Sequence, residues 1–118
     1  MNPDLDFGLH ALRSRYAEGT LTCRAVIDEV LARIAAAGDD KVWIARVPDD
    51  ALRARADALD ARRSEALPLF GVPFAVKDNI DVAGLPTTAA CPGFAYAPQK
   101  SAEIVQRLVD AGAIVVEM

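Results

Sequence analysis

Two short apolar runs in the second half of the chain limit its architecture most. Val72 to Val76 and Ala113 to Val116 each have the length and the apolar content of a buried strand. Between them, Ala102 to Ala111 has helical spacing, and Ser101 precedes it as a candidate N-cap. Two apolar strands joined by a helix form a β-α-β unit, whose strands pair in parallel through a right-handed crossover. The pattern therefore predicts an α/β fold. Two strands cannot have both faces covered in so short a chain, so we expect that fold to be incomplete here.

Helices are expected to lead into this unit. Leu5 to Tyr16 places Leu5, Leu9 and Leu12 on one face, and Thr22 is a suitable N-cap for a helix that Gly38 ends. After the weakly alternating segment Val42 to Val47, which we expect to be extended or a short strand, Pro48 opens a helix that reaches about Arg63. In the later helix, we expect Ile104, Val105, Leu108 and Val109 to form the apolar face.

The length of 118 residues is sufficient for one domain but is small for two. We expect a single segment, with residues 1–65 as a helical lead-in and residues 66–118 as strand, loop, helix and strand.

Charge and composition exclude several classes of function. A net charge of -4 argues against nucleic acid as a partner, because nucleic-acid binders usually carry a basic patch. No apolar run reaches the roughly 18 residues of a transmembrane helix, and the first residues lack a signal-peptide layout. We therefore expect a cytoplasmic protein without a membrane partner. The chain has a single histidine and two widely separated cysteines, so we expect no metal site. It also lacks the glycine-rich motifs that bind phosphate groups, so we expect no nucleotide cofactor.

Lys77 stands at the carboxyl end of the first apolar strand, where ligands of β-α-β units bind. One interpretation is a solvated ammonium group whose stem packs on the strand. The other is a lysine in a dry pocket, where burial would lower its pKa and the neutral amine could take a proton from a serine hydroxyl. The segment from Lys77 to Lys100 has no regular pattern, and loops of this length are usually functional.

A nucleophilic serine for that mechanism is not evident. Ser14, Ser64 and Ser101 are the serines of the chain, and none lies in a glycine-rich turn that would expose a hydroxyl beside an oxyanion hole. We expect the nucleophile, if there is one, to lie outside these residues.

Four polar residues follow the lysine. Asp78 and Asp81 could act as general bases, but organising the turn around Asn79 is the favoured interpretation, because aspartate binds nearby backbone amides. Thr87 and Thr88 could equally line a substrate pocket or support the loop.

The run GVPFAVKDNIDVAGLPTTAACPGFAY, followed by SAEIVQRLVDAGAIVV, closely resembles the N-terminal part of the amidase signature enzymes. The resemblance implies a mixed sheet covered by helices, of which this chain would be the first part. It also implies a serine–cis-serine–lysine triad in which Lys77 relays protons, a small amide as substrate, no metal or cofactor, and possible homodimers of the complete protein. Both triad serines would belong to a later segment.

Within the family, KDNIDVAGLPTTAACP with FAY shortly after it looks most like the allophanate hydrolases, which convert allophanate to ammonia and carbon dioxide. The alternatives are another amidase, the A subunit of a tRNA-dependent amidotransferase, or a truncated module without catalysis. Glu117 stands where the family commonly has glycine, so either this subgroup differs there or the chain is a piece.

Overall fold

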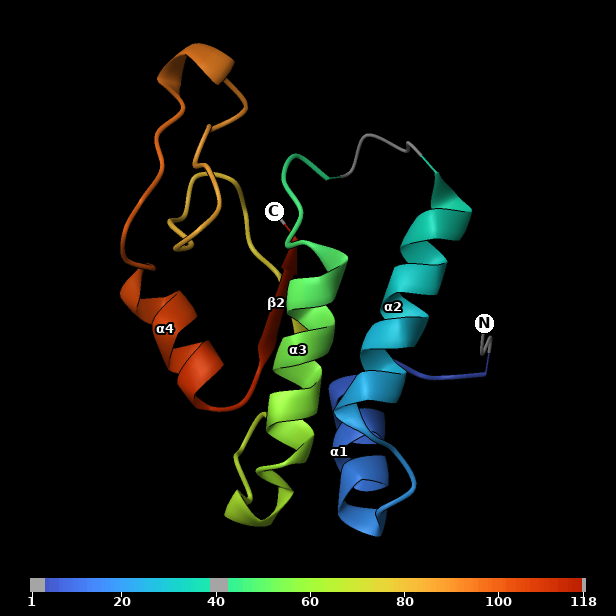
Figure 1. Cartoon of the computed structure of the whole chain (residues 1–118). Coiled ribbons are helices and arrows are strands. Elements are labelled where there is room, and N and C mark those ends of the chain that lie inside the picture. The colour runs from blue at the N-terminus through green and yellow to red at the C-terminus, as the bar shows by residue number, and fades with distance from the viewer. Residues whose placement is uncertain (1–3, 39–42, 118) are drawn as a thin grey trace.

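The computed structural model describes residues 4–38 and 43–117. Helices precede a small sheet, and a long loop separates the two strands (Figure 1). The elements in chain order are α1 (Leu9–Glu18), α2 (Cys23–Ala37), α3 (Asp49–Asp60), η1 (Arg63–Glu65), β1 (Pro73–Ala75), η2 (Pro92–Phe94), α4 (Glu103–Asp110) and β2 (Ile114–Glu117). No helix in the described ranges is long and apolar enough to cross a membrane.

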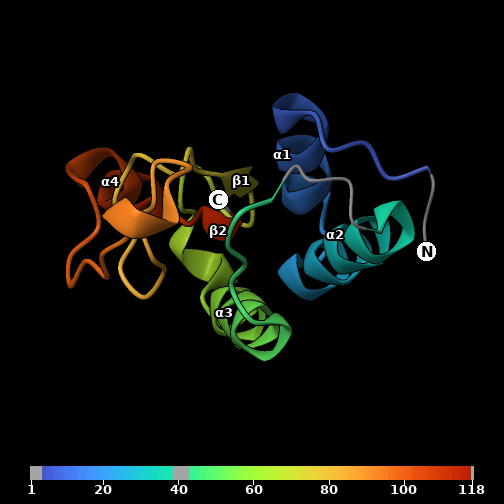
Figure 2. The same ribbon diagram turned by 90° about the horizontal axis from the view of Figure 1, so that it is seen from above.

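The predicted parallel strand pair is confirmed. Pro73 pairs with Ile114 and Phe74 with Val115, and α4 forms the crossover between β1 and β2. Helix α2 packs against α3, and α3 packs against β2, while α4 lies on the other side of the sheet from α1 and α2 (Figures 1 and 2). The loop of residues 77–102 rises from the carboxyl end of the strands.

Strand β1 is less buried than its composition predicted. Pro73 and Phe74 are half-buried and Ala75 is exposed. Only β2 pairs with β1 among the described residues, so one edge of β1 remains open. The prediction of a buried strand is therefore wrong for β1, whereas Ile114 and Val116 of β2 are buried.

Local signals placed the boundaries of α2 correctly. The Thr22 hydroxyl oxygen accepts a hydrogen bond from the Ala25 amide at 3.1 Å, and Gly38 ends the helix at a φ of 65°. Helix α1, in contrast, begins at Leu9 instead of Leu5, because Gly8 precedes its first turn. Leu5 and Leu12 are buried, but Leu9 is exposed, which corrects the predicted face.

Helix α4 differs from its prediction in two ways. The Ser101 hydroxyl is not its N-cap, since the oxygen accepts a hydrogen bond from the Ala83 amide across the loop at 3.0 Å. Ile104 is 62% exposed, while Val105 is buried. The core-facing stripe is therefore narrower than the sequence indicated.

The segment before α3 is extended but forms no strand in its described part. Val42 lies outside the described residues. Arg46 makes an isolated antiparallel bridge with Glu117, and the Val47 amide donates to the Val116 carbonyl at 3.1 Å. The Arg46 guanidinium also pairs with the buried Glu117 carboxylate at 2.7 Å.

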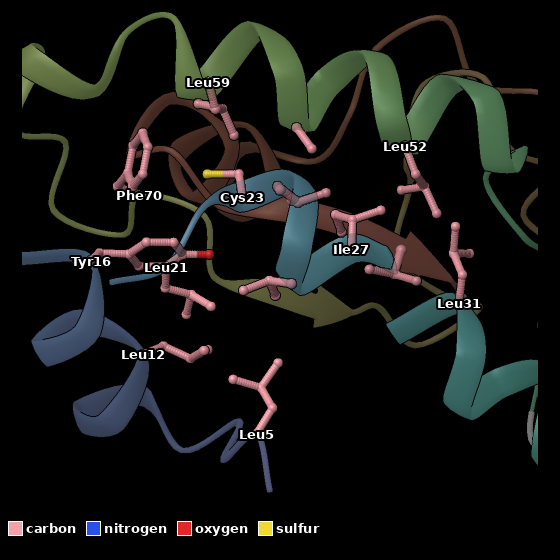
Figure 3. Packing of buried hydrophobic residues seen from close by; sticks show 14 residues of the cluster. Leu5, Leu12, Tyr16, Leu21, Cys23, Ile27, Leu31, Leu52, Leu59 and Phe70 are labelled. Atoms are coloured by element: carbon pink, nitrogen blue, oxygen red, sulfur yellow. The ribbon is translucent and has the colours of Figure 1, made fainter. Parts of the chain in front are cut away.

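Most buried side chains belong to one core between α1, α2, α3 and the sheet (Figure 3). A second, smaller core lies under the loop, and its buried members are Val76, Val82, Leu85 and Val105. The loop is thus packed on the β-α-β unit instead of projecting freely from it.

Two glycines hold the start of the strand pair. The Gly71 amide donates to the Gly112 carbonyl at 3.0 Å, and both residues have positive φ, 68° and 101°. A Cβ atom at Gly71 would lie 2.5 Å from Cζ of Tyr16 and 2.7 Å from Sγ of Cys23. Glycine is therefore needed at this position both for its backbone conformation and for the space around it.

Candidate functional site

Lys77 lies two residues after Ala75, the last residue of β1, and begins the long loop. Its side chain is exposed and, within the described ranges, makes no hydrogen bond or ion pair. The exposed position of Lys77 is the one that the solvated interpretation expects. Its position at the carboxyl end of a parallel strand is the one that the sequence predicted.

Asp78, the next residue, is buried. Its carboxylate accepts hydrogen bonds from the Thr88 amide at 2.9 Å, from the Ala90 amide at 3.1 Å, and from the Thr88 hydroxyl. The Ala89 amide donates to the Asp78 carbonyl at 3.1 Å. Asp78 therefore fastens the far arm of the loop to the end of β1. The sequence predicted that the Asp78 side chain would organise the turn around Asn79. Instead it binds backbone amides that lie ten and twelve residues further along the chain.

These contacts favour the ionised form of Asp78. The hydrogen bond from the Thr88 hydroxyl, assisted by the two amides and opposed by burial, lowers the pKa of Asp78. A carboxylate that already accepts three donors is a poor general base. The structure therefore favours loop support for Asp78 and Thr88 over a direct role in proton transfer.

Asp81 makes a second fastening. The Thr87 hydroxyl donates to Asp81 Oδ1 at 3.0 Å, and the Tyr96 hydroxyl donates to the same oxygen. The backbones of Thr87 and Tyr96 exchange hydrogen bonds of 2.8 and 3.1 Å. Because its phenol donates to a carboxylate, the pKa of Tyr96 is raised. Thr87 is buried and engaged in this way, so loop support is again the interpretation that the geometry favours.

Tyr96 was missed as a supporting residue. Its partner lies fifteen positions earlier in a segment without periodicity, so no spacing rule connects the two. The only signal in the sequence was its place in the FAY triplet.

Backbone strain accompanies the first fastening. Ala89 and Ala90 have φ values of 50° and 60°, in the left-handed region that favours glycine. Each such residue costs about 1–2 kcal/mol, and the contacts to Asp78 offset that cost. The strained pair contacts Asp78, the residue after Lys77.

Other candidate chemistry is not brought together. Cys23 is buried in the main core, whereas Cys91 is exposed on the loop. Among residues 4–38 and 43–117, no three histidine, cysteine or acidic side chains gather as metal ligands. The support contacts also leave the side chain of Lys77 exposed on this loop.

Comparisons with known proteins agree on one relationship. A family model described as Amidase matches residues 25–117. Urea amidolyase of Saccharomyces cerevisiae is 54% identical over 78 residues, which is 65% of this chain and 4% of that protein. The A subunit of the glutamyl-tRNA(Gln) amidotransferase of Chlorobaculum tepidum is 40% identical over 113 residues, or 92% of this chain and 23% of that protein.

The fold comparison gives the same result. The structure of Kluyveromyces lactis allophanate hydrolase superposes with a TM-score of 0.73 at 36% sequence identity, covering 93% of this chain and 18% of that one. The chain therefore spans a small part of each of these relatives.

Proposed function

This chain belongs to the amidase family, and we propose that it is the lysine-bearing part of an allophanate hydrolase. The observation that carries the proposal is the placement of Lys77 at the carboxyl end of β1, on a loop fastened by Asp78 and Asp81. The similarity to the allophanate hydrolase of Kluyveromyces lactis supports the choice of allophanate, a small linear amide, as substrate.

In the proposed reaction, Lys77 acts as a base once the site is complete. The neutral amine would take a proton through a cis-serine from a nucleophilic serine, which attacks the substrate carbonyl. Ammonia would leave, and water would then release the acyl group from the serine. Ser14, Ser64 and Ser101 do not fit these roles, because within the described ranges none of them is hydrogen-bonded to Lys77 and Ser101 is engaged with Ala83.

The exposure of Lys77 bears on this mechanism. The proposal therefore requires that further residues of the complete enzyme cover Lys77 and exclude water from its amine. By itself the 118-residue chain is expected to be inactive. We also propose that the complete protein is cytoplasmic, needs no metal or organic cofactor and forms homodimers.

A second candidate is the A subunit of a tRNA-dependent amidotransferase. It is favoured by one observation: the similarity to the Chlorobaculum tepidum protein extends over nearly the whole chain, while that to urea amidolyase covers 65% of it. Measuring ammonia release from allophanate, glutamine and simple amides by the complete enzyme distinguishes the two. Release from allophanate alone supports the first proposal, and release from glutamine supports the second.

The role of Lys77 is tested in the same complete enzyme. Lys77→Ala should abolish turnover and leave the thermal unfolding midpoint nearly unchanged, because the side chain makes no described contacts. Lys100→Ala, which removes another exposed lysine of the same loop, is the matched control and should keep normal turnover. Near-normal activity of Lys77→Ala would exclude the proposed role.

A further inference from the structure

A hollow lies at the opposite end of the sheet from Lys77. It has a volume of about 400 Å³ and is formed by the end of α1 and the segment that leads into β1. Figure 1 shows α1 and the residues after α3 together at the bottom of the molecule, away from the long loop. The hollow is therefore separate from the proposed catalytic end.

The hollow is basic although the chain is acidic overall. Arg13 and Arg63 line it, and no acidic residue does so among the described residues around it. Arg63 donates one hydrogen bond to the Tyr16 carbonyl at 2.8 Å, which leaves other guanidinium N–H groups available. Within the described ranges, the Arg13 side chain has neither an ion pair nor a hydrogen bond.

Two acidic side chains near the hollow already have partners. Glu65 accepts two hydrogen bonds from Arg62, at 2.8 and 2.9 Å. Asp60 accepts hydrogen bonds from the backbone amides of Cys23 and Arg24 at 2.8 and 3.1 Å. Among the described residues, neither carboxylate forms an ion pair with Arg13 or Arg63.

Part of the wall is aromatic and firmly held. Tyr16 and Phe70 meet edge to face with ring centroids 5.1 Å apart, and Figure 3 shows them together at the end of the core. The Tyr16 hydroxyl is fixed by a 2.8 Å hydrogen bond to the Gly71 carbonyl. Leu67 and Pro68 add aliphatic surface. Arg63 lies over the Phe70 ring, with its guanidinium carbon 5.8 Å from the centroid.

We propose that this hollow binds a small carboxylate with an aromatic or aliphatic body. Guanidinium groups bind carboxylates through paired, charge-assisted hydrogen bonds, and the aromatic and aliphatic wall accepts the apolar part. A cation is disfavoured by the two arginines, and a neutral amide of the same shape lacks the charge that they select. This site is independent of the proposed hydrolase activity.

The test uses the 118-residue chain and benzoate as the probe, followed by amide chemical-shift changes in NMR. Benzoate should give saturable shifts centred on Arg13, Tyr16 and residues 66–70. Benzamide, which has the same shape without the charge, and inorganic phosphate, which has the charge without the ring, should bind more weakly. Raising the ionic strength should weaken benzoate binding.

Variants assign the binding to the two arginines. Arg13→Gln should weaken benzoate binding by about three- to tenfold, because one charge-assisted contact at an exposed position is lost. Arg63→Gln should do the same, but it also removes the bond to Tyr16, so its fold is checked by circular dichroism. Arg107→Gln is the control, since Arg107 pairs with Glu103 on the exposed side of α4.

Three results would overturn the proposal. They are benzoate shifts that do not saturate, benzamide or phosphate binding as tightly as benzoate, and unchanged binding in Arg13→Gln. The last variant keeps the test decisive even if Arg63→Gln fails to fold.

Discussion

Replacing Gly71 by alanine should destabilise the chain far more than the same change at Gly84, another glycine with positive φ. At Gly71 the new methyl group would collide with the Tyr16 ring and with Sγ of Cys23, 2.7 Å away. Overpacking of this kind costs about 1–3 kcal/mol. Moving the Tyr16 ring would also break its bond to the Gly71 carbonyl, at about 1 kcal/mol more. The left-handed backbone adds about 1 kcal/mol.

Gly84 provides the matched control. Its φ is 88°, and a Cβ atom there would meet nothing within 4 Å. Gly84→Ala therefore carries the backbone cost alone, and both substitutions share the same change in the unfolded chain. Subtracting one from the other leaves about 2–4 kcal/mol for the crowding at Gly71.

Urea unfolding followed by far-UV circular dichroism measures both variants against the unmodified chain. Because small domains have a total stability of about 5–15 kcal/mol, the expected loss in Gly71→Ala should appear as a large drop in the midpoint. In Cys23→Ala the Sγ atom is absent, so adding Gly71→Ala to that background should cost less than in the original chain. Equal losses in Gly71→Ala and Gly84→Ala would refute the reasoning, since they would show that only φ requires glycine here.

Two further predictions concern titratable side chains. The hydrogen bond from Thr88 lowers the pKa of Asp78 in the folded chain. The ionised carboxylate therefore stabilises the fold above the ordinary pKa of 3.8, and this contribution is lost as the pH falls through the lower folded value. Asp78→Asn should reduce the loss of stability at acid pH, measured as urea midpoints from about pH 2 to 6, and an unchanged pH dependence would contradict the assignment. Burial and the nearby Asp60 raise the pKa of Cys23 to about 12. At about pH 8 a thiol reagent should therefore label only the exposed Cys91 in the folded chain, and both cysteines in urea. Rapid labelling of both cysteines without urea would contradict the buried position of Cys23.

The parts of the fold that local rules decide were predictable. The cap at Thr22 and the stop at Gly38 depend on residues within one helical turn. The parallel strand pair followed from two apolar runs and a helix between them, because chain connectivity leaves few alternatives.

Tertiary contacts decided the rest. Ser101 has a hydroxyl suited to a helix cap, but the Ala83 amide eighteen residues earlier competes for it. Ile104 and Val105 are adjacent apolar residues, and the sequence alone does not show which of them is buried. In the structure only Val105 packs into the core. The role of Asp78 could be expected in kind, as support for a turn, but its partners lay too far along an irregular loop to be identified.

The candidate site also combines features that local sequence decides with features that tertiary contacts decide. The position of Lys77 at a strand end was readable from the sequence, because it depends only on where β1 stops. Its exposure was not, since a lysine at that place suits either a solvated or a covered environment. Tyr96 supports the loop through an isolated bridge to Thr87. No local sequence pattern predicts this pairing.

The fastenings of the long loop have a consequence for engineering. The hydrogen bonds of Asp78, Asp81, Ser101 and Tyr96 described above all join partners that lie within residues 78–102. The loop thus carries its own internal scaffold between β1 and α4, and it meets the rest of the unit mainly through the small core of Val76, Val82, Leu85 and Val105. Such a segment can be exchanged between related enzymes as one cassette. We expect a graft of residues 78–102 to keep its conformation where the recipient has apolar residues at the positions of Val76 and Val105.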